Sequence, residues 1–143
     1  MLIRITSDPL DEALAKAAVS APANGAVLVF HGVVRDHHEG RAVERIEYHA
    51  YLAMAERELA LVADEVGQRH GVRDIAVLHR IGPLVVGETS LIVAIGAPHR
   101  QEAFAAGLDL IDTLKARVPI WKKEIGPGGT VWQDGVLPPA PRE

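Results

Sequence analysis

The sequence predicts a single α+β domain with a mixed sheet and about three helices. Its 143 residues suffice for one hydrophobic core, and no long linker divides them. Short β-branched runs are interspersed with amphipathic helical segments, and no internal repeat is present. We therefore expect one domain over residues 1–135. Val136–Glu143 contains three prolines and is expected to form a mobile C-terminal tail.

The first third of the chain predicts two strands and a short helix. Met1–Thr6 alternates as an edge strand does. Asp8-Pro9 provides an N-cap and a first helical residue for a helix that ends near Val19. Gly25–Val34 is a nearly continuous apolar run, which predicts a central strand buried on both faces. Arg35–Arg41 is expected to be a polar loop.

The middle of the chain predicts three strands and one long helix. Val43–His49 alternates as a strand, and Met54–Arg69 has one apolar face, typical of a helix that covers a sheet. Asp74–His79 and Ser90–Gly96 are apolar runs of strand length. Gly82-Pro83, between them, is expected to be a turn.

The last third predicts a helix followed by a hairpin. Gln101–Val118 is the helix, and Pro119 ends it. Ile120–Glu124 and Thr130–Gln133 are the expected strands of the hairpin, joined by the turn Gly126–Gly129.

Composition excludes several classes of function. The net charge of −4 argues against a general nucleic-acid binder. The absence of cysteine excludes disulfides, thiolate metal sites and cysteine nucleophiles. No signal-like or membrane-spanning run is present, so we expect a cytoplasmic protein without membrane contact. The spacing of His37-His38 relative to His31 or His49 matches no zinc signature, so neither a metal nor another cofactor is expected.

Lysine is concentrated in one segment. Only four of the 15 basic residues are lysine, and three of these, including Lys115, fall within nine residues. On a helical wheel Lys115 lies within the apolar arc that contains Phe104 and Leu108. Two interpretations remain: the side chain extends to solvent near the helix C-terminus, or it lines a pocket where burial favours the neutral amine.

The residues after Pro119 suggest a second amine beside the first. In an extended segment Lys122 and Glu124 share one face, and Lys123 points to the other. The turn at Pro119 allows Lys122 to approach Lys115. Two neighbouring ammonium groups lower each other's pKa and attract anions.

Three further residues have the chemistry of an anion site. His99 and Arg100 precede a helix, where free N–H groups favour a phosphate, although a simple capping turn explains them equally well. Arg35 follows the longest apolar strand and is either a functional or a surface arginine. The sequence thus predicts a pocket for an anionic small molecule.

Several motifs resemble those of the molybdopterin synthase catalytic (large) subunit, the MoaE family, in order and spacing from about Leu2 to Trp132. They are Phe30–Arg35, Glu47–Tyr51 followed by Met54–Glu56, His79–Gly82, Val86–Glu88, His99-Arg100 with Ala103-Phe104, and Asp112–Lys115 continuing into Val118–Glu124. The last of these, with its Pro-x-Trp-Lys-Lys-Glu run, is the most specific.

The resemblance implies an α/β-hammerhead fold and a sulfurtransferase of molybdenum cofactor biosynthesis. The expected substrate is cyclic pyranopterin monophosphate (precursor Z), which receives two sulfurs and becomes molybdopterin. The expected sulfur donor is a ubiquitin-like carrier with a thiocarboxylated Gly-Gly tail. The subunit is expected to form a homodimer that holds two carriers, giving a heterotetramer.

The resemblance also implies roles for individual residues. Lys115 and Lys122 would be catalytic. Five residues would bind substrate or line the site, namely Arg35, His99, Arg100, Lys123 and Glu124. His99 and Arg100 could come from the neighbouring protomer. Two rival hypotheses are a non-catalytic module that docks a ubiquitin-like tail and a different pterin-phosphate enzyme.

Overall fold

The computed structural model describes residues 1–133 of the chain. Within them the chain folds into one α+β domain with three helices, α1 (Glu12–Ala18), α2 (Leu52–His70) and α3 (Arg100–Arg117). The first sheet contains, in order, β1 (Leu2–Thr6), β6 (Asp74–Arg80), β8 (Thr89–Ala97) and β2 (Ala26–Val33). The second contains β10 (Gly129–Gln133), β9 (Ile120–Gly126), β5 (Arg45–Ala50) and β7 (Gly82–Val85). The predicted tail falls outside the described residues.

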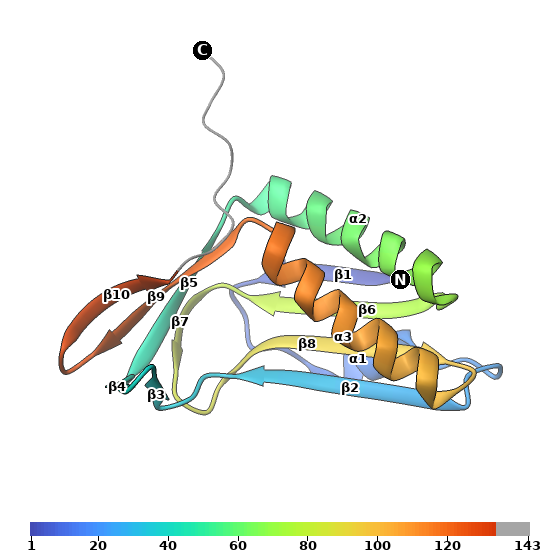
Figure 1. Cartoon of the computed structure of the whole chain (residues 1–143), viewed down its shortest axis with the longest axis horizontal. Coiled ribbons are helices and arrows are strands. Elements are labelled where there is room, and N and C mark those ends of the chain that lie inside the picture. Colours follow the sequence, from blue (N-terminus) through green and yellow to red (C-terminus); the bar gives the residue numbers. More distant parts are fainter. Residues whose placement is uncertain (134–143) are drawn as a thin grey trace, which may run out of the picture.

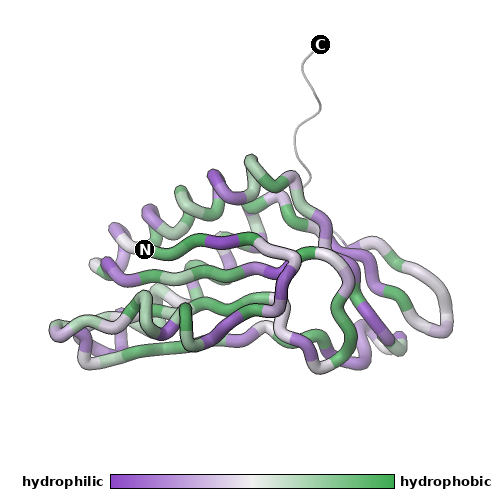
Figure 2. The backbone as a smooth tube through the Cα atoms, turned by 180° about the vertical axis from the view of Figure 1, so that it is seen from behind, coloured by the Kyte–Doolittle hydropathy of each residue, from purple (hydrophilic) through white to green (hydrophobic). Residues whose placement is uncertain are grey.

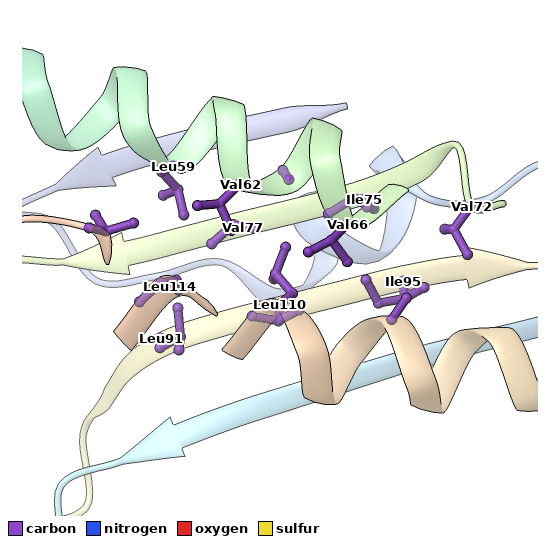
Figure 3. Packing of buried hydrophobic residues seen from close by; sticks show 14 of the residues in the cluster. Leu59, Val62, Val66, Val72, Ile75, Val77, Leu91, Ile95, Leu110 and Leu114 are labelled. Atoms are coloured by element: carbon purple, nitrogen blue, oxygen red, sulfur yellow. The ribbon is translucent and has the colours of Figure 1, made fainter. Parts of the chain in front are cut away.

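The first sheet lies between two helical layers. Helices α2 and α3 cover one face, and α1 lies on the other (Figure 1). Alternation along β6 produces this division, because Ile75 and Val77 face α2 and α3 while Ala76 and Leu78 face α1. Figure 3 shows the larger core, in which residues of α2 and α3 meet the sheet. The sheet is mixed, since β1 is parallel to β6 and the other pairs are antiparallel.

The position of β2 contradicts its prediction as a central strand. It lies at the edge of the sheet and pairs only with β8, which is the strand buried along its whole length. Val27, Phe30 and Val33 of β2 are exposed in the single chain. The prediction was wrong because a buried central strand and an edge strand with an exposed apolar surface contain the same types of side chain.

Three local predictions also need correction. Helix α1 begins at Glu12 rather than at Pro9, because the Asp11 side chain accepts a hydrogen bond from the Ala13 amide and is the N-cap. Gly82-Pro83 is not a turn but starts the short strand β7, at the edge of the second sheet, where a proline needs no ladder partner. The loop at residues 35–41 contains β3 (His37–His38), which pairs with β4 (Arg41–Ala42).

The second sheet projects beyond the end of the first (Figures 1 and 2). Its central strand β5 pairs with β7 and β9, and β9 forms the predicted hairpin with β10. A separate apolar cluster that includes Ile46 and Leu84 supports this sheet. Pro119 ends α3 and β9 begins at Ile120, so the helix leads directly into the second sheet. No helix among the described residues has the length and apolar character needed to cross a membrane.

Candidate active site

A cavity of about 590 Å³ lies where the C-terminal end of α3 meets the two sheets. Its size falls in the range of small-molecule sites. The cavity is lined by residues of α3, of seven strands (β2, β3, β5, β6, β8, β9 and β10) and of the segment after β2, among them Arg35, Tyr48, His79, Ser90, Lys115, Lys122 and Gln133. Side chains far apart in sequence therefore converge here.

Three of the predicted cationic residues meet in this cavity. Arg35, Lys115 and Lys122 all line it, as the turn at Pro119 led us to expect. Burial lowers the pKa of Lys122, and the positive charges of Lys115 and Arg35 lower it further, against an opposing effect of Glu124. The cavity thus combines positive charge for anion binding with an amine that releases its proton more easily than an ordinary lysine.

The helical wheel was right for only part of the buried face of α3. Leu114 and Gly107 are buried as predicted, but Phe104 and Leu108 are 63% and 65% exposed, and Ala103 and Ala106 are buried instead. Lys115 lines the cavity with an exposed side chain. Lys122 is therefore the half-buried amine of the cavity in the single chain. Close packing of α3 against β2 selects small residues, as at Gly107, where a Cβ would lie 2.9 Å from Leu28 Cδ2.

Glu124 is a buried carboxylate that holds two side chains of the cavity wall in place. Its carboxylate is 4% exposed and accepts hydrogen bonds from His38 Nδ1 at 2.9 Å and from Gln133 Nε2 at 2.7 Å. Arg41 lies 3.5 Å from the same oxygen. Glu124 thereby joins the β3–β4 hairpin to β9 and β10 and fixes two side chains, His38 and Gln133, that line the cavity.

Lys123 lies on the opposite face of β9, as alternation predicts. Its ammonium group is 3.3 Å from Glu47 Oε2 and 5.3 Å from the centre of the Trp132 ring. It is not among the residues that line the cavity. The ion pair and the cation–π contact account for its position without a ligand.

His99 and Arg100 lie at the other end of α3. His99 is the N-cap, its amide donates to Glu102 Oε2 at 3.1 Å, and the two residues form a capping box. Fifteen helical residues separate Arg100 from Lys115, a distance of about 22 Å along the axis. One chain therefore does not bring His99 and Arg100 to the cavity.

Five polar residues of the cavity were not predicted as site residues. Besides His38 and Gln133, they are His79, Tyr48 and Ser90. Burial lowers the pKa of His79 to about 4, and burial raises the pKa of Tyr48, against a hydrogen bond to Ser90. The available signal was a histidine at the end of an otherwise apolar strand, Asp74–His79.

Buried His79 is expected to make the protein less stable in acid. Its pKa is about 4 when folded, against 6.5 for an ordinary histidine. Between these values the unfolded chain binds the extra proton, so stability is full above pH 6.5 and falls as the pH drops toward 4, by up to roughly 3 kcal/mol. Urea denaturation at several pH values, with His79→Gln as the comparison, measures this. An equal slope in the variant would show that other groups cause the loss.

A second, shallower hollow of about 820 Å³ borders the second sheet. Its lining is mainly aromatic and aliphatic and includes Tyr51, Leu52 and Trp121. The ring of His49 stacks on Trp121 with centroids 6.1 Å apart. Trp121 lines both hollows, but the three cations line only the first. The first is therefore the candidate active site.

Comparison with known proteins agrees with this geometry. A family model described as "MoaE protein" matches residues 5–117. The molybdopterin synthase catalytic subunit of Staphylococcus carnosus is 39% identical over 128 residues, which are 90% of this chain and 85% of that protein. The crystal structure of molybdopterin synthase from Staphylococcus aureus superposes with a TM-score of 0.86 at 37% identity and covers 91% of this chain and 95% of that one.

A further solved structure shares the fold at lower identity. It is described as a complex of subunits 1 and 2 of the molybdopterin-converting factor of Helicobacter pylori. Its TM-score is 0.72 at 21% identity, with 91% of this chain and 88% of that chain covered.

The α+β fold and its cationic cavity are those of a small enzyme subunit. The chain belongs to the MoaE family, the catalytic subunits of molybdopterin synthase, and works in molybdenum cofactor biosynthesis.

Proposed function

We propose that the cavity transfers two sulfur atoms to cyclic pyranopterin monophosphate (precursor Z) and so forms the dithiolene of molybdopterin. The sulfur would come from the C-terminal thiocarboxylate of a ubiquitin-like carrier. The observation that carries this proposal is the convergence of Arg35, Lys115 and Lys122 on one cavity. Both the substrate phosphate and the thiocarboxylate are anions, and both require positive charge in a confined space.

Lys122 is the residue best suited to proton transfer. Its pKa is lowered by burial and by the neighbouring cations, so the neutral amine is more accessible than in an ordinary lysine. Arg35 would hold the phosphate through the fork of N–H donors on its guanidinium group. Lys115, exposed at the cavity rim, would meet the incoming carrier tail. Lys123 and Glu124 would act from behind the cavity by fixing the position of β9.

The carrier is proposed as a protein partner. The Helicobacter pylori structure is described as a protein–protein complex of two subunits. We extend this arrangement to the present chain, with a small ubiquitin-like subunit whose Gly-Gly tail enters the cavity. The lack of cysteine in the chain is compatible with sulfur that arrives on a partner. The reaction is proposed to take place in the cytoplasm.

A homodimer is proposed through β2 and α3. Phe30 and Val33 on the edge strand, together with Phe104 and Leu108 on the helix packed against it, form an exposed apolar surface. Such a surface on an unpaired edge is typical of an interface between subunits. Phe30 and Val33 also line the cavity, so a second subunit on this surface would contact the site. Two carriers bound to this dimer would give a heterotetramer.

The dimer would also explain His99 and Arg100. A two-fold axis across α3 would set the two helices antiparallel, which brings the N-terminal end of one helix beside the C-terminal end of the other. His99 and Arg100 of the partner subunit would then reach the cavity that contains Lys115, and would add a cation and a helix N-terminus for the phosphate.

The test is reconstitution of the reaction. Purified protein, thiocarboxylated carrier and precursor Z are mixed, and the product is identified by mass as the species with two added sulfurs. Carrier ending in an ordinary carboxylate is the control and should give no product. Tight binding of the carrier without product would favour the rival hypothesis of a non-catalytic docking module.

A further inference from the structure

A buried, neutral histidine lines the cationic cavity. His79 ends the apolar run of β6 and is 5% exposed, yet it is among the residues that line the cavity. It is the one imidazole at this depth among the described lining residues, since His38 belongs to the Glu124 cluster. A buried polar ring without an evident structural need calls for a chemical explanation.

The hydrogen-bond partner of His79 fixes its tautomer. Nδ1 lies 2.9 Å from the backbone carbonyl oxygen of Arg80. A carbonyl can only accept, so Nδ1 carries the hydrogen and Nε2 of the neutral ring holds a lone pair. Because burial lowers the pKa to about 4, on the order of one molecule in a thousand is protonated at pH 7. No residue of the described chain forms a hydrogen bond with Nε2.

The hydroxyl groups beside His79 already donate hydrogen bonds to other groups of the protein. The ring of Tyr48 packs edge-on against that of His79, with centroids 5.2 Å apart. The Tyr48 hydroxyl donates to Ser90 Oγ at 3.4 Å, and Ser90 Oγ donates to the Gly32 carbonyl at 3.2 Å. Both hydroxyl hydrogens thus have acceptors within the protein, and residues 1–133 offer no donor to the lone pair of His79 Nε2.

The lining of the cavity therefore combines two kinds of group. Arg35, Lys115 and Lys122 supply positive charge and hydrogen-bond donors, whereas His79 supplies an acceptor. A ligand that carries both an anion and N–H donors satisfies both. The proposed substrate has this form, with a phosphate joined to a reduced pterin that carries ring N–H and amino groups.

We propose that Nε2 of His79 accepts a hydrogen bond from a ring N–H or amino group of the pterin and so orients the heterocycle toward the lysines. This inference rests on the proposed function and specifies how the site recognises its substrate. With its low pKa His79 is a poor general base at neutral pH, so its role is to bind and orient rather than to remove a proton.

Two variants that differ by one methylene test the proposal. His79→Asn can keep a donor near the Nδ1 position for the Arg80 carbonyl, but places nothing where Nε2 lay. His79→Gln can place an amide oxygen close to the Nε2 position. Binding of precursor Z and of inorganic phosphate is measured by calorimetry for each variant and for Arg35→Ala, after thermal melting has verified that each protein is folded.

We expect His79→Asn to weaken binding of precursor Z about 10-fold, the effect of one lost hydrogen bond to a buried donor. Binding of inorganic phosphate should change less than about two-fold, because the phosphate meets only the cations. His79→Gln should recover part of the lost affinity. Arg35→Ala should weaken both ligands.

Unchanged binding of precursor Z by His79→Asn would overturn the proposal, and so would an equal loss for both ligands, which indicates general distortion. If His79→Asn fails to fold, His79→Leu, which also lacks an acceptor at the Nε2 position, takes its place: weaker binding of precursor Z at unchanged phosphate affinity supports the proposal, and unchanged binding of both ligands overturns it. Failure of the wild-type protein to bind precursor Z at all would instead refute the proposed function.

Discussion

Replacement of Lys122 with alanine is expected to lower the rate of molybdopterin formation by about 10²–10³-fold. The side chain is the half-buried amine of the cavity, and two neighbouring cations lower its pKa. The variant loses both a positive charge next to the substrate anions and a group able to transfer a proton. Single-turnover assays with preloaded carrier measure the chemical step without product release.

Lys123→Ala is the matched comparison. Lys123 is adjacent in sequence but lies on the other face of β9, paired with Glu47. We expect its replacement to lower the rate far less than that of Lys122, since it removes a contact that supports the strand. Equal losses in the two variants would mean that the segment matters only for its structure, and the assignment of Lys122 would be wrong.

Two inactive variants are expected to restore activity when mixed. If the site combines Lys122 of one subunit with Arg100 of the other, Lys122→Ala and Arg100→Ala are each inactive as homodimers. After denaturation and refolding together, half of the dimers contain one variant of each kind, and each of these holds one intact site. The mixture should therefore recover about one quarter of wild-type activity.

The control for this experiment is a pair that cannot complement. In a mixture of Lys122→Ala and Lys115→Ala, the two substituted residues are ones that a single chain supplies to its own cavity. A heterodimer then has two damaged sites and should stay inactive. Lack of recovery in both mixtures would contradict the shared site.

The sequence was sufficient for most elements and for part of the site. Periodicity located α2, β6, β8 and the β9–β10 hairpin, because a buried face imposes a local pattern on its own segment. Proline at position 119 predicted the end of α3 and the turn that brings Lys122 toward Lys115. These features depend on covalent geometry and on neighbours in sequence.

Other features depend on what lies across the fold. The edge position of β2 is set by pairing with β8. An apolar run of this kind is compatible with a central strand and with an exposed edge strand, so the sequence does not distinguish the two positions. The buried face of α3 is set by close contact with the sheet, which requires alanine and glycine rather than the larger Phe104 and Leu108. A wheel that weights large apolar residues therefore placed Phe104 and Leu108 in the core incorrectly.

The sequence by itself determined the family, the α+β class and the identity of the lysine segment, since these are encoded in contiguous motifs and local periodicity. Only the tertiary structure decided that Lys122 is the half-buried amine, that Lys123 faces away, and that buried His79 lines the cavity. The reason is physical. Burial, pKa and hydrogen-bond satisfaction are properties of neighbours in space, and those neighbours come from seven strands and a helix that no local pattern brings together.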